Sequence, residues 1–166
     1  MTGSETSKKL LSRAGRILSR RAHSRGELRQ KLSRYGGPEQ IESVLDRLEE
    51  LNLLNDAEYA YNFALCRMKQ DGWGPLKVLQ ALRKYEVNSD LAEEMVGLVR
   101  KEAGDIDLLQ EYLQRHCRKT GLPQDRKGLQ RLVSHLRRRG FQEETIYDAL
   151  RHLTRAVSRL PLDTGD

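Results

Sequence analysis

The sequence has few of the residues on which several common classes of protein depend. It contains two cysteines, four prolines and one tryptophan among 166 residues, and aromatic residues make up 5%. Neither Cys66 nor Cys117 has another Cys or a His at a zinc-binding spacing, because the adjacent His116 cannot face the same metal ion as Cys117 from a helix. A metal site is therefore disfavoured, and we expect two reduced, partly buried thiols.

Long hydrophobic runs are also missing. No segment approaches the roughly 18 to 20 apolar residues of a membrane-spanning helix, and the first residues, Met-Thr-Gly-Ser-Glu-Thr-Ser, lack the apolar centre of a signal peptide. Hydrophobic residues make up 37%, charged residues make up 33%, and mean hydropathy is -0.72. This composition supplies enough apolar residues for the buried faces of helices but too few for a thick core. From the missing hydrophobic runs we expect a cytoplasmic protein.

Catalytic motifs are missing as well. The four histidines are scattered singly, without His-x-x-x-His or His-Glu pairing. The segment Gly72-Trp-Gly-Pro75 lacks the Gly-x-x-x-x-Gly-Lys pattern of a phosphate loop, so Trp73 is interpreted as a wedge or a partner contact. Asp56 and Glu58 could act as paired acids only in a pocket, and a helix cap explains both. The sequence therefore predicts no catalytic residues and no enzyme.

What the sequence does contain is an internal repeat. Three times, a basic helical pattern is followed, after a turn, by an acidic one, and the copies centre on Leu32, Leu82 and Leu136, which are 50 and 54 residues apart. After Leu82, and again after Leu136, two further apolar residues follow at positions +13 and +14. After Leu32 the corresponding two residues follow one position earlier. Such a repeat predicts similar helical units in a row, which favours an extended surface over a single catalytic pocket.

Local signals place the ends of the predicted helices. Candidate N-terminal caps are Ser24 with Glu27 as a capping box, Asn55, any of Asn88, Ser89 and Asp90, and Asp125. Pro38 and Pro75 suit the first turns of two further helices, where a missing N–H has no helical partner. Gly140 suits a left-handed helix end, after which Phe141 can fold back onto the preceding helix.

The predicted fold class is all-α, an elongated and curved tandem array of three three-helix repeats. Nine segments have apolar residues at helical spacing, and none alternates long enough to indicate a strand. The predicted repeats cover residues 8–51, 56–101 and 105–157, and we expect residues 158–166 to fray. The predicted buried stripes include Leu51, Leu76 and Leu129.

Basic and acidic residues are concentrated in different predicted helices, and the net charge of the chain is +6. Residues 1–34 contain ten Lys or Arg against two acids, and residues 115–139 contain nine against one. Residues 39–64 reverse this ratio, with seven acids against one Arg. The first two helices and the eighth should therefore form basic surfaces suited to an anionic partner.

Thirteen cations on the basic helix of each copy are the candidate filament- or DNA-binding residues. They are Arg25, Arg29, Lys31, Arg34, Lys77, Arg83, Lys84, Arg126, Lys127, Arg131, Arg137, Arg138 and Arg139. The helix macrodipole also favours cations near helix C-termini, and this alternative stays open for Arg34, Lys84 and residues 137–139. It does not explain Arg25, Arg126 or Lys127, which lie near helix starts.

A helix, a tight turn and a second helix also suit a helix-turn-helix reader of DNA, whose second helix contacts the bases. Here the second helices are acidic, with Glu39 and Glu42, Glu93 and Glu94, and Glu143 and Glu144. Phosphate would repel them, so we expect no sequence-specific groove reading. Non-specific contact between the basic helices and a DNA backbone stays open.

An ordered set of short segments points to a family. The segments are Ser24-Arg-Gly-Glu-Leu28, Leu28-Arg-Gln-Lys-Leu32, Val44-Leu-Asp-Arg-Leu48, Leu53-Leu-Asn-Asp56-Ala-Glu-Tyr-Ala60, Gly74-Pro-Leu-Lys-Val-Leu79 and Leu136-Arg-Arg-Arg-Gly-Phe141. Together they resemble the RecX family of bacterial recombination regulators over about residues 8 to 154. Asn55 stands where that family usually has Asp, and Asn52 and Glu86 stand where Gly is usual. Asn tolerates a left-handed backbone, whereas Glu86 is harder to place.

The resemblance implies a cytoplasmic protein that binds the RecA recombinase filament in its helical groove. It further implies a modulator that mostly inhibits ATP hydrolysis, strand exchange and coprotease activity, and that contacts single- or double-stranded DNA non-specifically. We expect a monomer without cofactor, metal or membrane partner. Two alternatives remain, namely a non-specific DNA-binding helical protein that acts without a recombinase and a protein-only adaptor that uses the acidic helices.

Overall fold

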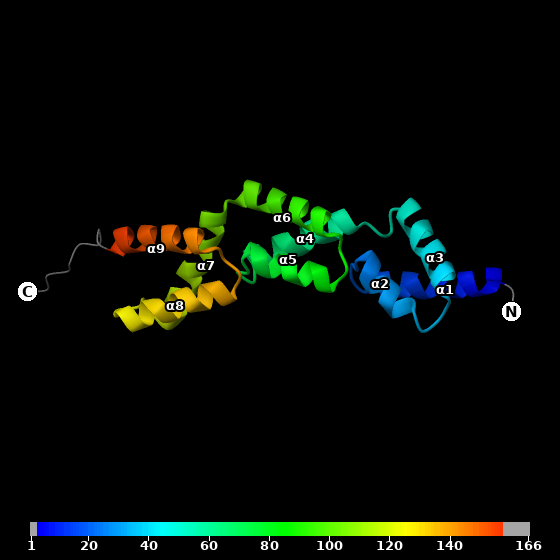
Figure 1. The fold of residues 1–166 in the computed structure, drawn as a ribbon, viewed down its shortest axis with the longest axis horizontal. Coiled ribbons are helices and arrows are strands. Elements are labelled where there is room, and N and C mark those ends of the chain that lie inside the picture. The colour runs from blue at the N-terminus through cyan, green and yellow to red at the C-terminus, as the bar shows by residue number, and fades with distance from the viewer. Residues whose placement is uncertain (1–2, 158–166) are drawn as a thin grey trace, which may run out of the picture. The chain divides into compact units, whose positions relative to one another are not determined.

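The computed structural model describes residues 3–157, and it describes side chains for residues 5–151. Within residues 3–157 the chain forms nine α-helices and no strand (Figure 1), which confirms the all-α fold class. The helices are α1 (Gly3–Leu18), α2 (Arg25–Leu32), α3 (Pro38–Glu50), α4 (Asp56–Lys69), α5 (Pro75–Lys84), α6 (Ser89–Ala103), α7 (Asp105–Thr120), α8 (Arg126–Arg138) and α9 (Glu143–Val157). The predicted frayed tail, residues 158–166, lies outside the described residues.

Side-chain caps begin four of these helices, as the sequence predicts. The side-chain oxygens accept from backbone N–H groups as follows: Ser24 from Glu27 at 3.1 Å, Asn55 from Glu58 at 3.1 Å, Asn88 from Leu91 at 3.2 Å, and Asp125 from Gly128 at 2.6 Å. Each bond satisfies an N–H that has no partner inside its helix. The carboxylate of Glu27 binds Arg21, at 3.1 Å from its Nη1, so the second half of the predicted capping box is replaced by an ion pair.

Proline and glycine act at the helix ends where the sequence places them. Pro38 and Pro75 are the first residues of α3 and α5. Gly140 has a φ of 86°, in the left-handed region, and the N–H of Phe141 donates to the carbonyl of Leu136 at 3.3 Å. The ring of Phe141 is buried, so the chain folds back onto α8 as predicted.

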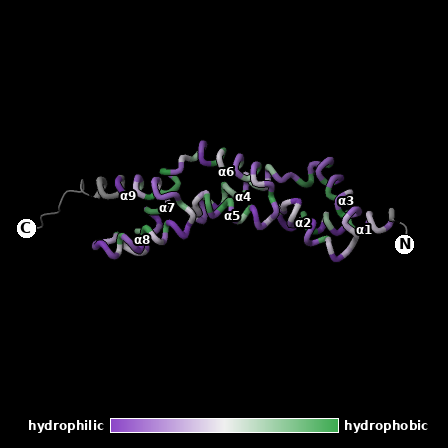
Figure 2. Tube along the Cα trace, viewed as in Figure 1, coloured by the Kyte–Doolittle hydropathy of each residue, from purple (hydrophilic) through white to green (hydrophobic). Residues whose placement is uncertain are grey.

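Amphipathic patterning accounts for most of the burial. Hydrophobic and hydrophilic residues follow one another in short bands along the helices (Figure 2). The prediction is wrong for Leu51, Leu76 and Leu129, which are 46%, 51% and 42% exposed. Leu51 follows the last residue of α3, and the other two lie in the first turns of α5 and α8, so all three sit at helix ends rather than over a core.

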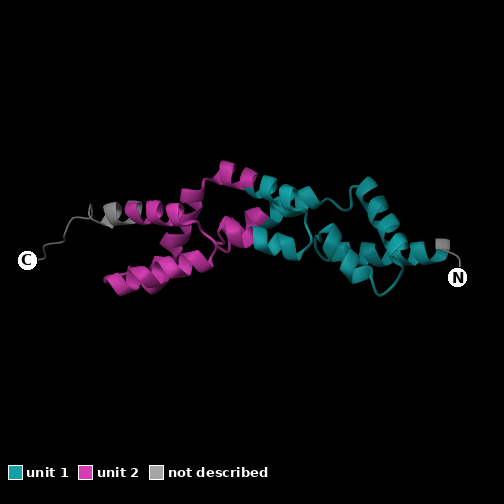
Figure 3. Cartoon of the chain, viewed as in Figure 1, with its two compact units in different colours: residues 1–63, 79–96 teal, residues 64–78, 97–166 magenta. Residues whose placement is uncertain are grey.

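The chain divides into two compact units (Figure 3). Among the described residues, unit 1 comprises residues 3–63 and 79–96, and unit 2 comprises residues 64–78 and 97–157. Each unit thus contains one terminal helix triplet and part of α4, α5 and α6. The repeat boundaries predicted from the sequence stay a prediction, since they describe sequence units rather than these compact units.

The core of unit 1 lies between its three N-terminal helices. The buried residues come from α1, α2, α3 and the turn after α3, and they are Leu10, Ala14, Leu28, Leu32, Ile41, Val44, Leu45, Leu48 and Leu54. Ile17 and Leu18 pack against them. This burial fixes which face of α1 and α2 remains at the surface.

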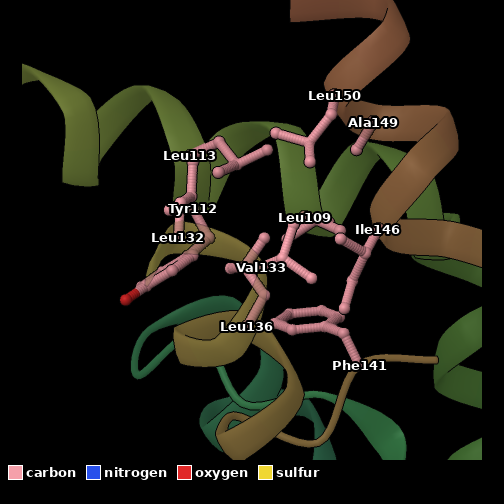
Figure 4. Close-up of a cluster of buried hydrophobic side chains, with 10 residues drawn as sticks. All are labelled: Leu109, Tyr112, Leu113, Leu132, Val133, Leu136, Phe141, Ile146, Ala149 and Leu150. Atoms are coloured by element: carbon pink, nitrogen blue, oxygen red, sulfur yellow. The ribbon is translucent and has the colours of Figure 1, made fainter. Parts of the chain in front are cut away.

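The core of unit 2 has the same organisation, with α7, α8 and α9 in place of α1, α2 and α3. Figure 4 shows the side chains pointing toward one another from the three helices and from the turn at Phe141. The buried residues are Leu109, Tyr112, Leu113, Leu132, Val133, Leu136, Phe141, Ile146, Ala149 and Leu150. Two triplets with similar cores agree with the repeat seen in the sequence.

Both cysteines are free thiols. Cys117 is partly buried, as expected, and burial raises the pKa of its thiol. Cys66 is exposed, which corrects the expectation of partial burial, because it lies on the outer face of α4. In the described part of the chain, no helix is both long and apolar enough to cross a bilayer.

Candidate interaction surface

The thirteen candidate cations fall into two groups. Eight are exposed, and their side chains form no ion pair, hydrogen bond or ring contact with any described residue. These eight are Lys31, Arg34, Arg83 and Lys84 in unit 1, and Arg126, Lys127, Arg131 and Arg138 in unit 2. The other five have partners inside their own unit, so the two groups differ in the charge that they can offer to a ligand.

Arg25 is the most heavily paired of the candidates. Its guanidinium binds Asp46 and Glu49 at 2.6 Å each and Glu42 at 2.7 Å, and its side chain is 20% exposed. Although partial burial lowers the pKa of Arg25, the hydrogen bonds to the three carboxylates raise it on balance. The acidic face of α3 is therefore neutralised in part by the first residue of α2.

Arg29 continues this network one turn further along α2. It hydrogen-bonds both carboxylate oxygens of Glu42, and its Nη1 lies 3.5 Å from the carboxylate of Glu86. Hydrogen bonds from Arg29 and Arg25 lower the pKa of Glu42 to about 2. A binding role for Arg25 and Arg29 stays a prediction, and it requires a ligand that displaces these carboxylates.

Truncating Arg25 should destabilise unit 1. In Arg25→Ala, Glu42, Asp46 and Glu49 lose their shared cation and repel one another, so we expect a loss of about 1 to 2 kcal/mol in the free energy of unfolding. The matched control is Arg47→Ala, because Arg47 forms one exposed pair with Glu50. The control should stay within about 0.5 kcal/mol of the parent in urea unfolding. Equal losses in both variants would contradict a structural role for Arg25.

Glu42 should make stability depend on acidity. The pKa of Glu42 falls from 4.5 to about 2 on folding. Its contribution to the free energy of unfolding is therefore fully present above pH 4.5 and is lost as the pH falls toward 2. Solvent screening limits this contribution to about 1 kcal/mol, since the side chain is 40% exposed. The difference in unfolding free energy between the parent and Glu42→Gln should therefore shrink across this window. A pH-independent difference would contradict the ion pairing.

Asp56 has a different role from the predicted one. The sequence predicts that Asp56 belongs to the N-terminal cap of its own helix, α4, but the side chain of Asn55 forms that cap. The carboxylate of Asp56 instead accepts from the backbone N–H of Arg25 at 2.6 Å, so it caps the start of α2. Burial raises the pKa of Asp56, and the hydrogen bond from Arg25 opposes this rise.

The paired cations of unit 2 lie against aromatic rings and carboxylates. The ammonium of Lys77 lies 4.3 Å from the ring centre of Trp73, and the guanidinium of Arg139 lies 5.0 Å from that of Tyr112. Arg139 also donates to the carbonyl of Asp71, and Arg137 pairs with Glu143 at 2.9 Å. Trp73 is thus in contact with cations of its own unit, and its interpretation as a wedge or a partner contact stays a prediction.

A junction between successive basic helices occurs once in each unit. In unit 1, Ser24 before α2 donates its hydroxyl to the carbonyl of Tyr85, just after α5. In unit 2, the N–H of Gly74 before α5 donates to the carbonyl of Arg139 at 2.7 Å, just after α8. The start of one basic helix thus binds the end of the next. These contacts join residues 61 and 65 positions apart, so no local sequence signal predicts them.

Glycines allow the close approach at both junctions. A Cβ on Gly26 would lie 2.2 Å from the Cβ of Glu86, and one on Gly74 would lie 2.3 Å from the carbonyl carbon of Gly140. Glu86 itself has a φ of 55°, in the left-handed region that favours glycine. Its carboxylate binds Gln30 and Arg29, which is a contact that glycine could not make.

Comparisons with known proteins give a consistent result. Residues 11–48 match the sequence profile described as the first three-helix domain of RecX. The regulatory protein RecX of Prosthecochloris aestuarii is 38% identical over 154 residues, which cover 92% of this chain and 98% of that protein. The protein of the same name from Deinococcus radiodurans is 36% identical over 156 residues, which cover 92% of this chain and 72% of that protein.

Solved structures show the same fold. The crystal structure of RecX from Lactobacillus salivarius superposes with a TM-score of 0.80 at 19% identity, over 91% of this chain and 98% of that one. A second crystal structure, of a regulatory protein RecX, gives a TM-score of 0.70 at 22% identity, over 86% of this chain and 70% of that one. At these identities the structures establish the fold alone.

Proposed function

The chain belongs to the RecX family of regulatory proteins, and from this membership we propose that it binds the RecA nucleoprotein filament and restrains it. The observation that carries the proposal is the 38% identity to a regulatory protein RecX over 92% of the chain. We propose that it binds in the helical groove of the filament and slows ATP hydrolysis, strand exchange and coprotease activity. Its relatives are named regulatory proteins, which supports a cytoplasmic modulator without enzymatic chemistry of its own.

The exposed cations support this role physically. A nucleoprotein filament presents DNA phosphates, and the eight exposed cations, which have no acidic partner among the described residues, suit such an anionic partner. Arg25, Arg29 and Arg137 would contribute less, because each is already paired with carboxylates of its own unit. Binding should therefore weaken with rising salt.

ATP hydrolysis by a preassembled filament tests the proposal. The chain is added to RecA on single-stranded DNA, with all DNA already covered, and phosphate release is followed. We expect hydrolysis to fall in proportion to the chain added, because a ligand in the groove bridges neighbouring protomers. Unchanged hydrolysis at a concentration that saturates the filament would contradict restraint.

A second candidate function is non-specific DNA binding without a recombinase. The exposed cations in both units favour it, because phosphate contacts need no sequence readout. Inhibition that appears only when free DNA is present, and disappears when the DNA is covered, would indicate this function instead.

A further inference from the structure

Three rings stack between α7 and α8 of unit 2. Tyr112 and His116 come from α7, and His135 comes from α8. The imidazoles of His116 and His135 have ring centres 4.8 Å apart and planes inclined by 17°. The ring of Tyr112, which belongs to the buried core, lies 5.7 Å from that of His116 and 6.1 Å from that of His135, again in nearly parallel planes. The stack therefore joins the two helices at the edge of their core.

This arrangement suits neutral imidazoles. The hydroxyl of Tyr112 and Nε2 of His135 are hydrogen-bonded at 2.7 Å, and Nε2 of a neutral ring can accept this bond. Neutral rings also pack face to face as aromatic groups. Two imidazoliums in the same positions would hold two positive charges 4.8 Å apart. At this separation near a protein surface, like charges repel strongly enough to change an equilibrium constant by about tenfold or more.

The neighbouring charges do not relieve this repulsion. His116 and His135 line a pocket of about 540 Å³, to which α9 contributes no described residue. The other titratable or charged residues in the lining are Cys117 of α7, Asp125 before α8, and Arg131 and Arg138 of α8. Asp125 is the acid among them, and its Oδ1 already caps the start of α8. The pocket is therefore positive even while both imidazoles are neutral.

Cations outside the pocket lining act in the same direction. The guanidinium of Arg139, just after α8, lies 5.0 Å from the ring centre of Tyr112. The carboxylate of Asp71, whose carbonyl accepts from Arg139, pairs with Arg67. Burial lowers the pKa of His135, and the positive charges of His116, Arg139, Arg138 and Lys77 lower it further. His135 is therefore neutral near pH 7 in the folded chain.

We propose that His116 and His135 form an acid-sensitive latch between α7 and α8. While both rings are neutral, the stack holds the two helices together. Protonation of the pair drives the rings apart and opens the packing of unit 2. This inference goes beyond the proposed function, because the latch acts within unit 2 and needs no partner, so either can fail without the other.

The latch gives the stability of the chain a defined dependence on pH. The pKa of His135 is lowered in the folded state from its ordinary value of 6.5, so the unfolded chain takes up this proton more readily. The free energy of unfolding therefore decreases as the pH falls below 6.5. The carboxylate of Glu42 does not contribute in this range, because its pKa of about 2 in the folded chain and its ordinary value of 4.5 both lie lower.

Urea unfolding at about pH 7.5 and about pH 5.5, followed by the fluorescence of Trp73 in unit 2, tests the latch. The parent is compared with a variant that carries His116→Gln and His135→Gln, in which neither side chain titrates. Between these two pH values, the unfolding equilibrium constant of the parent should rise about tenfold more than that of the variant. The buried His23 of unit 1 is present in both chains, so its contribution cancels. Equal rises in parent and variant would overturn the proposal.

Nuclear magnetic resonance titration of the imidazoles tests the coupling of the two rings. In His116→Gln, His135 should titrate at higher pH than in the parent, because no charge on His116 opposes its protonation. The matched control is Arg118→Gln, which removes an exposed cation of α7 that does not line the pocket and should shift the titration of His135 far less. A folded parent in which His135 is already protonated at pH 7 would overturn the proposal.

Hydrogen exchange tests the opening itself. After correction for the intrinsic effect of pH on exchange, peptides from residues 105–138, which contain α7 and α8, should lose protection in the parent on acidification. The same peptides of the variant with both histidines changed to Gln should keep their protection. Unchanged protection in the parent would show that protonation leaves the two helices packed, and it would overturn the latch.

Discussion

Replacing Gly74 with alanine should destabilise unit 2 by about 3 kcal/mol. The new Cβ would lie 2.3 Å from both the carbonyl carbon and the oxygen of Gly140, and neither backbone atom can rotate away. Overpacking against backbone typically costs about 1 to 3 kcal/mol. The hydrogen bond from Gly74 N–H to Arg139, at 2.7 Å, would be stretched or lost, which costs about 1 kcal/mol more.

Gly97→Ala is the matched control for this change. Gly97 lies within α6, and a Cβ added there meets nothing within 4 Å. Since alanine is the better helix former, Gly97→Ala should stabilise the protein by about 0.5 to 1 kcal/mol. Urea unfolding followed by the fluorescence of Trp73, the single tryptophan and the neighbour of Gly74, measures both variants. Equal effects would show that Gly74 holds no close junction.

Reversing the exposed cations of α8 should weaken filament binding roughly 100-fold at low salt. The variant changes Arg126, Arg131 and Arg138 to Glu, and none of these side chains has an ion-pair partner among the described residues. Each reversal removes an attraction and adds a repulsion of order 1 kcal/mol with an anionic partner. Helicity should be unchanged, because the buried stripe of α8, Leu132, Val133 and Leu136, is untouched.

The control for this variant reverses three exposed cations on α3, α4 and α6, namely Arg47, Lys69 and Lys101, with the same change in net charge. Co-sedimentation with RecA filaments measures both. The control should bind within about threefold of the parent, because long-range attraction alone is screened at moderate salt. If both sets weaken binding equally, net charge rather than the α8 surface determines affinity.

Local signals made the helices predictable. Ser24, Asn55, Asn88 and Asp125 cap helices through bonds that span three residues, so the sequence alone contains both partners. The same holds for Gly140, whose left-handed φ follows from the turn after α8. The exposed leucines at helix ends were mispredicted, because periodicity does not show where a neighbouring helix stops.

The candidate surface was less predictable, because pairing is a tertiary property. The sequence places Arg25 near a helix start, where a cation is unfavourable alone, and this favoured a binding role. In the structure, three carboxylates of α3 surround the guanidinium of Arg25, and their attraction offsets the unfavourable position near the helix start. The basic region at residues 1–34 was visible, but its cations line a groove between α1 and α2 only because of how these two helices pack.

Glu86 shows how a departure from a family pattern can be interpreted. Its left-handed backbone has an energetic cost of about 1 to 2 kcal/mol that glycine avoids. Its side chain offsets part of this cost by binding Gln30 and Arg29 of α2. The sequence marked the position as unusual, and the junction between α2 and α5 gives the reason.

The central claim is that the chain recognises an assembled recombinase filament, and binding to four targets tests it most directly. Labelled chain is titrated with bare single-stranded DNA, bare duplex, RecA alone, and RecA assembled on DNA with nucleotide. We predict that the assembled filament binds at least about tenfold more tightly than any other target, since it presents protein and phosphate surfaces together. Equal affinity for bare DNA and for the filament would contradict the claim.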